Sequence, residues 1–355
     1  MPTARYVEPA FLALERERVF RRAWLCAGPA RHLRVPGDYV TFDASGEALV
    51  LWRDTDGALR AFHNTCRHRG TRLLEGPTGH VKAIRCPYHD WKYALDGRLR
   101  HIPGQDGFDG RIDRASLSLL PVRAAEWAGQ LWVTLSDTAP PLLDTLGTLV
   151  DELRPYRLEE MRPIQEVTWT ESLNWKAVLD NATESYHLPF VHGGSVDRHV
   201  SERPEFTTYG DHYRLTLAIA NTGWRRSLDS LTARGGPYTE RQRAALHKYV
   251  LFPNFLMNVL PYHLTVFVVW PTAVDQCRFF YGFYEREGAR GLEWLRARAT
   301  WLASRWILHE DFRILNRFQR GVASGRSPSH HYHAQEVALA HFHAVLSRWI
   351  GSDPA

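Results

Sequence analysis

The chain has 355 residues, of which 44% are hydrophobic and 23% charged, enough to bury the cores of two ordinary domains. Its longest apolar runs, such as Leu264–Trp270, are far too short to cross a bilayer, and its first residues lack the apolar stretch of a secretory signal. We therefore expect a cytoplasmic protein without a membrane partner. The net charge of +5 is spread along the chain without a Lys- or Arg-rich block, so nucleic-acid binding is a weak interpretation. A basic face for an acidic protein partner or an anionic substrate explains the charge at least as well.

The spacing of apolar residues changes along the chain. Helical spacing within Arg5–Trp24 predicts an N-terminal helix. Between Pro36 and Leu135, short β-type runs separated by turn signals predict an antiparallel β domain, and a Pro pair marks residues 136–147 as a linker. Beyond this linker, aromatic and β-branched strands alternate with helices predicted at Trp175–His187 and Leu292–Phe318. This mixture favours an α+β fold in which helices cover one face of an antiparallel sheet.

Four cysteines stand among eighteen histidines, which argues against a disulfide framework and favours mixed metal ligation. Cys66 and His68 form a C-x-H pair, and Cys86 and His89 form a C-x2-H pair after a gap of 17 residues. Each pair lies between predicted strands, so the two loops could converge. Two thiolates and two imidazoles are the ligands of a Rieske [2Fe–2S] cluster. A Cys2His2 zinc site and unliganded core or surface residues remain alternatives, although zinc fingers seldom interleave their ligands in this order.

A second pair of histidines, His187 and His192, flanks Pro189 in the second half of the chain. Residues five apart do not share one face of a helix, but a turn at the proline would bring the two rings together. One added carboxylate would complete the two-His-one-carboxylate triad, which leaves positions on Fe(II) open for O2 and substrate. On spacing alone, two histidines that are hydrogen-bonded within the core are the commoner arrangement.

The sequences around both constellations resemble one family. CRHRG at 66–70 and CPYHDWKYALDG at 86–97 are similar to the two cluster loops of Rieske ring-hydroxylating oxygenase α subunits. The stretch NWKAVLDNATESYHLPFVH at 174–192 is similar to the mononuclear-iron segment of the same family, and it follows the cluster motif in the family's order. Two motifs in the right order are much more specific than either alone.

This resemblance covers nearly the whole chain and implies its domains and its activity. The implied parts are an N-terminal helical segment at 1–35 that packs with the catalytic domain, a Rieske antiparallel β domain at 36–140, and a helix-grip catalytic domain at 141–355. The implied reaction is the O2-dependent mono- or dihydroxylation of a small organic substrate, which we expect to be aromatic. Electrons from NAD(P)H would enter through a partner flavin reductase, with or without a ferredoxin, because the chain has no nicotinamide or flavin motif of its own.

The resemblance also supplies a third iron ligand. Asp311, in HEDFRILNRFQRG at 309–321, matches the family's late E-D…Q-x-G helix, in which the Asp binds iron. Glu310 is the rival carboxylate, but it points to a different side of the helix, and we expect it to be solvated.

Glu184 stands three residues before His187, where the family has a carboxylate that joins two metal centres. In the family's head-to-tail homotrimer, with or without a β subunit, this residue would bridge His187 to His89 of a neighbouring chain. Such a carboxylate fixes the tautomer and orientation of a ligand imidazole. The family more often has Asp at this place. Asn181 is expected near the iron.

The surroundings of the cluster carry one departure and one further hypothesis. Where the family often has Gly after the second cluster histidine, this chain has Asp90, which leaves open a less tightly turned loop or an aspartate that faces a neighbouring chain. Basic residues around the cluster suggest a docking patch for an acidic ferredoxin. They are Arg67, Arg69, Arg72 and Arg85.

A histidine-rich tail suggests a third metal site, which we reject because a packing helix is predicted from Ala334 to Ile350. Its histidines are His330, His331, His333, His341 and His343.

Three other functions stay open at this point. Glu184 and the C-terminal pattern also resemble the branch of the family that acts on quaternary amines such as choline, betaines and carnitine, for which aromatic residues would form a cage. A Rieske electron-transfer protein would carry the cluster without the mononuclear iron. A zinc-binding interaction protein would be colourless.

Overall fold

The structure is a computed structural model. It describes residues 1–193, 204–218 and 238–351. The chain divides into two compact units, a small unit at Phe20–Ala139 and a large unit made of Met1–Val19 and Pro140–Ala355. Among the described residues, no helix combines the length and the apolar character of a membrane span.

The small unit consists of short antiparallel strands, as its alternating pattern predicts. Seven of its strands form one sheet in the order β1-β10-β9-β4-β3-β2-β5, and three form a second sheet in the order β6-β7-β8. Their bounds are Leu25–Pro29 (β1), Asp38–Ala44 (β2), Glu47–Arg53 (β3), Leu59–His63 (β4), Thr78–His80 (β5), Ile84–Arg85 (β6), Lys92–Tyr93 (β7), Leu99–His101 (β8), Pro121–Trp127 (β9) and Gln130–Thr134 (β10). Trp52 of β3 stacks on Phe62 and donates its indole N–H to the carbonyl oxygen of Leu95 at 2.6 Å. The larger sheet is thereby tied to the segment that follows β7.

The N-terminal segment is shared between the two units. Strand β1 pairs with β10, and all five of its residues are buried, so the chain from Phe20 onward belongs to the small unit. The expected segment 1–35 is therefore divided, with Met1–Val19 alone in the large unit. The predicted helix at Arg5–Trp24 is also shorter, because regular α-helix ends at Glu15 and a π turn follows before β1.

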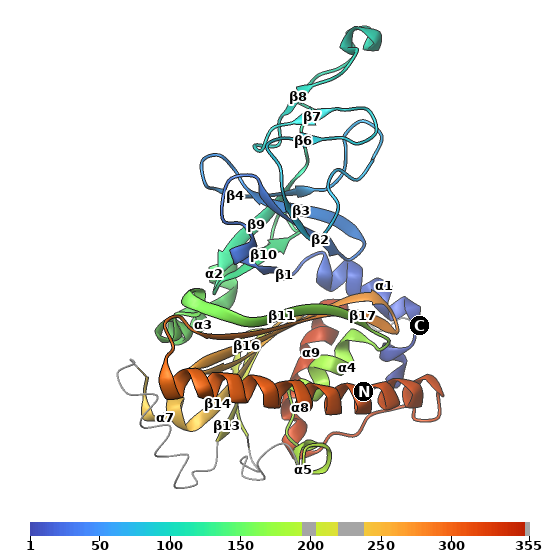
Figure 1. Cartoon of the computed structure of the whole chain (residues 1–355). Coiled ribbons are helices and arrows are strands. Elements are labelled where there is room, and N and C mark those ends of the chain that lie inside the picture. Colours follow the sequence, from blue (N-terminus) through green and yellow to red (C-terminus); the bar gives the residue numbers. More distant parts are fainter. Residues whose placement is uncertain (194–203, 219–237, 352–355) are drawn as a thin grey trace. The chain divides into compact units, whose positions relative to one another are not determined.

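The large unit is built on a second antiparallel sheet, in the order β11-β17-β16-β15-β14-β13-β12. The strands are Met161–Glu171 (β11), Glu205–Tyr209 (β12), His212–Ala218 (β13), Ala245–Leu251 (β14), Phe255–Leu260 (β15), His263–Ala273 (β16) and Gln276–Arg286 (β17). The described helices are Pro9–Glu15 (α1), Leu142–Leu146 (α2), Leu149–Leu153 (α3), Trp175–Ala182 (α4), Leu188–Val191 (α5), Glu240–Ala244 (α7), Gly291–Ala323 (α8) and Val337–Ile350 (α9). The long α8 runs along the sheet, and α4 contacts α8 as well as β16 and β17 (Figure 1). The predicted α+β fold is confirmed.

Two helix predictions and the predicted linker need correction. The helix predicted at Trp175–His187 is broken after Ala182, because the carboxylate of Glu184 accepts the backbone N–H groups of Tyr186 and His187 and so starts a new turn. Helix α8 continues past its predicted end to Ala323, before Gly325 adopts a positive φ of 67°. The predicted linker at 136–147 contains the short helix α2, which begins directly after its proline pair and buries two leucines.

Candidate functional site

The first constellation lies in two loops of the small unit. Cys66 and His68 follow β4, whereas Cys86 and His89 lie between β6 and β7. Both cysteines are buried, and the two imidazole rings lie 4.7 Å apart between centroids. Trp91 stacks on His68 at 4.8 Å with nearly parallel planes. The structure thus brings together all four residues that the sequence singled out.

The two loops have the same backbone hydrogen bonds. The N–H of Gly70 donates to the carbonyl of Cys66, and the N–H of Asp90 donates to the carbonyl of Cys86, both at 3.0 Å. Gly70 has φ 78° and Asp90 has φ 52°, so Asp90 adopts the left-handed conformation that favours glycine. A less tightly turned second loop, one of the two interpretations left open, is therefore wrong. The Asp90 carboxylate pairs instead with Lys92 at 3.3 Å and Arg85 at 3.6 Å.

The donor set of these loops fits a two-iron cluster. The Nδ1 atoms of His68 and His89 are buried and have no hydrogen-bond partner among the described residues, as expected of atoms that bind a metal. Burial, together with His89 and Arg69, lowers the pKa of His68, which keeps its imidazole neutral. Tyr93 places its hydroxyl 3.4 Å from Sγ of Cys66, within reach of a thiolate. Among the described residues, a different group has ligand atoms close enough together to bind a single metal ion.

That other group is His187, His192 and Asp311, whose ligand atoms all lie within 4.8 Å of one another. His187 and His192 flank α5, the single turn that contains Pro189, so the predicted turn does bring the rings together, 5.2 Å apart. Asp311 comes from the middle of α8 and places Oδ1 3.0 Å from Nε2 of His192 and 3.6 Å from Nε2 of His187. Two imidazoles and one carboxylate gathered in this way are suited to a facial triad.

Each histidine of the group is held from behind by a carboxylate. Glu184 contacts Nδ1 of His187, and Oε2 of Glu310 lies 2.8 Å from Nδ1 of His192. Such contacts fix the tautomer that leaves Nε2 available to a metal. Nε2 of His187 is buried and has no hydrogen-bond partner in the described part of the chain. The residues present fit a mononuclear iron site of the two-His-one-carboxylate type.

Neighbouring side chains position Asp311 and change the pKa of His192. Asn181 donates from Nδ2 to Oδ1 of Asp311 at 2.8 Å, so it lies beside the predicted iron position. Burial lowers the pKa of His192, but hydrogen bonds and charges from Asp311 and Glu310 outweigh burial and raise it overall. The two carboxylates thus favour a positive charge on His192.

Glu310 was misjudged from the sequence. Its expected solvation is wrong, since it holds His192 and also accepts a hydrogen bond from Nε1 of Trp306 at 3.0 Å. The sequence did carry a signal for this contact. Glu310 and Asp311 are adjacent carboxylates, and two such groups can contact the two nitrogens of one imidazole.

A cavity of about 230 Å³ opens beside the triad. Its wall is mostly apolar and includes Phe267, Phe279 and Phe312. Phe279 lies 5.1 Å from Phe312 and 5.8 Å from Phe267 between ring centroids, so the three form a continuous aromatic surface. Sequence reasoning missed the cavity's lysine, Lys248. Burial lowers the pKa of Lys248, and the carboxylates of Asp311 and Glu184 oppose that effect.

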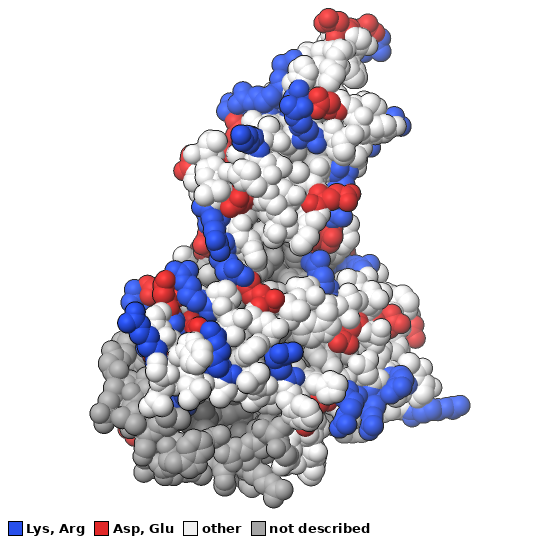
Figure 2. Space-filling view, viewed as in Figure 1, with Lys and Arg blue, Asp and Glu red and all other residues white. Residues whose placement is uncertain are grey.

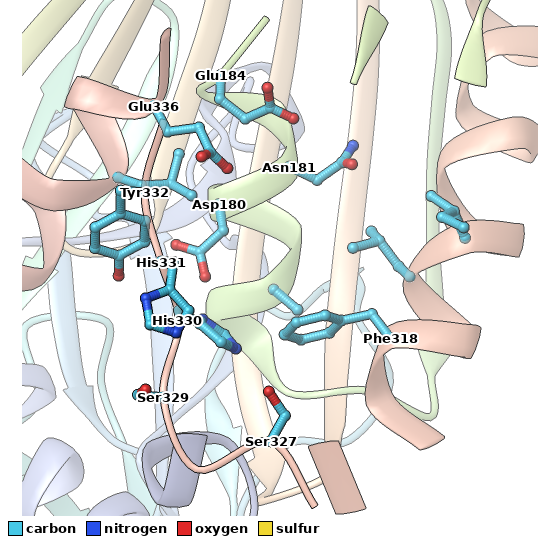
Figure 3. Close-up of a pocket in the computed structure, with 14 residues that line it drawn as sticks. Asp180, Asn181, Glu184, Phe318, Ser327, Ser329, His330, His331, Tyr332 and Glu336 are labelled. Atoms are coloured by element: carbon cyan, nitrogen blue, oxygen red, sulfur yellow. The ribbon is translucent and has the colours of Figure 1, made fainter. Parts of the chain in front are cut away.

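A second cavity, of about 430 Å³, is lined by Asn181 and Glu184 and by the segment that precedes α9. Figure 3 shows Asp180, Asn181 and Glu184 along one stretch of chain, with Tyr332 and Glu336 across the cavity. Asp180 is held in place by Tyr6 and, at 3.0 Å, by Nε2 of His343. The tail histidine His343 therefore supports α4 in the core.

The arginines proposed as a docking patch have acidic and aromatic neighbours. Arg72 pairs with Asp43, Arg85 with Asp90, and Arg69 lies over the ring of Tyr88. Figure 2 shows basic and acidic side chains interspersed on the face in view, rather than one sign alone.

Known families match both units. The ring hydroxylating alpha subunit (catalytic domain) family matches residues 158–352, more than half of the chain, and the Rieske [2Fe-2S] domain family matches residues 23–119. The chain belongs to the Rieske ring-hydroxylating oxygenase α-subunit family. The predicted enzyme class, a Rieske non-haem iron oxygenase, is confirmed.

Several relatives within this family of Rieske oxygenases have named substrates. The carnitine monooxygenase oxygenase subunit of Escherichia coli (strain K12) is 29% identical, over 98% of this chain and 93% of that protein. The glycine betaine monooxygenase oxygenase subunit of Chromohalobacter salexigens is also 29% identical, over 91% and 79%. The chloroplastic choline monooxygenase of Spinacia oleracea is 26% identical, over 98% and 77%.

Solved structures of Rieske oxygenases share the fold. A quaternary ammonium Rieske monooxygenase in complex with L-carnitine has a TM-score of 0.79 and 23% identity, covering 98% of this chain and 94% of that one. Naphthalene 1,2-dioxygenase from Rhodococcus sp. has a TM-score of 0.82 and 20% identity, covering 100% and 95%. The fold is common to oxygenases of both substrate classes and does not choose between them.

Proposed function

We propose that this chain is the terminal oxygenase component of a monooxygenase that oxidises a small quaternary amine. This reverses the order of the two substrate classes expected from the sequence, in which an aromatic substrate came first. The relatives described above are named for carnitine, glycine betaine and choline, which share a trimethylammonium group. The observation that carries the proposal is the aromatic surface of Phe267, Phe279 and Phe312 beside the metal triad, because aromatic faces attract quaternary ammonium ions.

Each unit contains the proposed ligands of one metal centre. Cys66 and Cys86 would bind one iron of the cluster, and His68 and His89 the other. His187, His192 and Asp311 would bind a single Fe(II), which supplies O2 activation once electrons arrive from the cluster. Around it, Glu184 and Glu310 orient the two imidazoles, and Asn181 orients Asp311. The cavity's apolar wall excludes water from the reacting carbon.

The proposed reaction balances with an external reductant. One oxygen atom of O2 enters a C–H bond of the substrate, the other leaves as water, and the partner supplies two electrons while solvent supplies two protons. Hydroxylation of a carbon bonded to the ammonium nitrogen lets the C–N bond break. The nitrogen keeps the bonding electrons, the hydroxyl loses its proton to solvent, and an aldehyde and an amine are released.

Two partners follow from this proposal. A separate reductase would pass electrons from NAD(P)H, directly or through a ferredoxin, to the cluster. In a homotrimer, Glu184 would link His187 to His89 of a neighbouring chain. The position of Glu184 on the wall of the second cavity supports this assignment, because a side chain of a neighbouring chain that enters the cavity could reach its carboxylate (Figure 3).

The test couples the purified holoenzyme to a surrogate reductase and offers glycine betaine, carnitine, choline, aromatic acids and aromatic hydrocarbons. We expect O2 uptake coupled to aldehyde release from a quaternary amine. Diols or phenols from the aromatic compounds, with no amine oxidation, would overturn the proposed substrate class. Iron content distinguishes an electron-transfer protein, which would contain only the iron of its cluster. After treatment with nitric oxide, such a protein would also lack the EPR signal of a separate ferrous site.

A further inference from the structure

A polar stripe crosses the sheet at the floor of the cavity beside the triad. Lys248 of β14 pairs with Asn258 of β15, and Asn258 pairs with Thr265 of β16. Residues opposite one another on neighbouring strands project to the same face. All three line this cavity, whose other sheet residues are mainly leucine and phenylalanine. The stripe is therefore a local polar patch in an apolar chamber.

Lys248 has donors to spare. Among the described residues, its Nζ donates one hydrogen bond, to the carbonyl oxygen of Ala182 at 2.9 Å. An ammonium group has three N–H donors, so a ligand in the cavity can take another. Because Ala182 ends α4, this contact holds Nζ beside the stretch that leads to Glu184 and His187.

The two neighbours of Lys248 are also suited to a polar ligand. Oδ1 of Asn258 is buried and has no hydrogen-bond partner among the described residues. Thr265 is 4% exposed and adds a hydroxyl. Rotation of the Asn258 amide exchanges its oxygen for its N–H2 group, so the stripe can present donors from all three side chains. In that orientation the N–H2 group, rather than the acceptor oxygen, would donate to a ligand carboxylate.

We infer that Lys248, Asn258 and Thr265 form a carboxylate-binding subsite of the oxygenase cavity. The substrate class is then a zwitterion, with its anionic end on the stripe and its ammonium end on the phenylalanine surface. The orientation of the ammonium end rests on the proposed function, whereas the carboxylate subsite does not. Lys248 would favour a betaine over an alcohol such as choline.

A purely structural role for Lys248 makes a different prediction. A cation at the C-terminal end of α4 stabilises that helix without contacting any substrate. Its removal would then lower the stability of the protein and weaken all ligands equally. The two roles differ in the ratio of affinities for matched ligands.

The test uses the reduced holoenzyme without O2 and measures binding by calorimetry for two matched pairs. Glycine betaine and choline share the trimethylammonium group, but the first carries a carboxylate where the second carries a hydroxymethyl group. Benzoate and benzyl alcohol differ in the same way on a phenyl ring. We expect Lys248→Met to lower the carboxylate-over-alcohol affinity ratio about ten- to hundredfold, the range for a charged hydrogen bond, and Lys248→Arg to restore part of it. Thr265→Val should lower the same ratio less.

Each outcome decides the inference. Equal loss for both members of a pair, an unchanged ratio, or no carboxylate preference in the native protein would overturn the subsite. A preference for benzoate that depends on Lys248, with no binding of either amine, would support the subsite and remove the proposed amine substrate. Binding of both amines, with an affinity ratio that Lys248→Met leaves unchanged, would overturn the subsite and support the proposed amine substrate.

Discussion

Oε2 of Glu310 lies 2.8 Å from Nδ1 of His192, on the opposite side of the ring from Asp311, whose Oδ1 lies 3.0 Å from Nε2. Two consecutive residues of α8 thus contact both nitrogens of one buried imidazole. Consecutive helical side chains diverge by about 100°. A ring placed edge-on between them can nevertheless be reached by both, which fixes its orientation before a metal binds.

Glu310→Ala should weaken Fe(II) binding at the triad about ten- to hundredfold, because the loss of a carboxylate behind a ligand histidine typically costs that much. The measurement is Fe(II) competition with a chelator in protein whose cluster absorbance is unchanged. Trp306→Phe is the matched control, since it removes a different hydrogen bond of Glu310 and leaves the contact with His192. Native affinity in the Glu310→Ala protein would mean that the carboxylate does not position His192.

Asp311→Ala should abolish mononuclear iron while leaving the visible spectrum of the cluster intact. Asp311 is the one member of the triad with a charged ligand atom, and its Oδ1 is the point on which both histidines converge. Iron content and turnover are measured on the same preparation. Full retention of both would remove Asp311 from the proposed ligand set.

Glu184→Gln should slow electron delivery more than it affects metal content. The native carboxylate accepts the backbone N–H of His187 at 3.1 Å while contacting its ring, and an amide has one acceptor oxygen for these tasks. We expect reoxidation of the reduced cluster by O2 and substrate to slow about ten- to hundredfold. Glu336→Gln, in the same cavity, is the control. Native reoxidation rates in the Glu184 variant would contradict a role between the two centres.

Local pattern predicted the order of the domains. It also singled out candidate ligands where they lie in short motifs, as at Cys66 and His68 or around Pro189. The alternation of apolar and polar residues and the aromatic runs predicted the strands of both sheets, because these patterns also lie in short stretches of sequence. The junction of the units was harder, because Leu25–Pro29 becomes a strand through pairing with β10, about a hundred residues away.

The cavity could not be read from sequence at all. Lys248 alternates with buried residues in β14, and only the order of strands in the sheet sets it beside Asn258 and Thr265. In the same way, the reach of Glu310 depends on where α5 meets α8. Such tertiary relationships follow from packing rather than from local propensity.

Asp90 offers a test of backbone conformation at the second cluster loop. Its φ of 52° is strained for alanine and relaxed for glycine, so Asp90→Ala should be less stable than Asp90→Gly by about 1 kcal/mol. Both variants lose the ion pairs with Arg85 and Lys92, which makes them a matched pair. The measurement is the urea midpoint for loss of cluster absorbance. Equal midpoints would show that the left-handed turn is not retained.

Glu152 of α3 connects that helix to the sheet of the large unit. It accepts hydrogen bonds from Tyr209 at 2.5 Å and Tyr249 at 2.7 Å, and it pairs with Arg214. Burial raises the pKa of Glu152, but these three partners outweigh burial and lower it below its ordinary value of 4.5. A lowered pKa in the folded state means that protonation favours the unfolded state.

The stabilisation from Glu152 should therefore be complete above pH 4.5 and should be lost as the pH falls through the lower folded-state pKa. Glu152→Gln keeps the size and one acceptor but removes the charge, so at pH 7 we expect a loss of about 1–3 kcal/mol in the free energy of unfolding. The difference between the native protein and the variant should narrow as the pH is lowered below 4.5, since protonated Glu152 resembles glutamine. Urea unfolding of both proteins from pH 7 downward measures this difference. A gap that stays constant or widens in acid would mean that the contacts of Glu152 stabilise the fold independently of its charge.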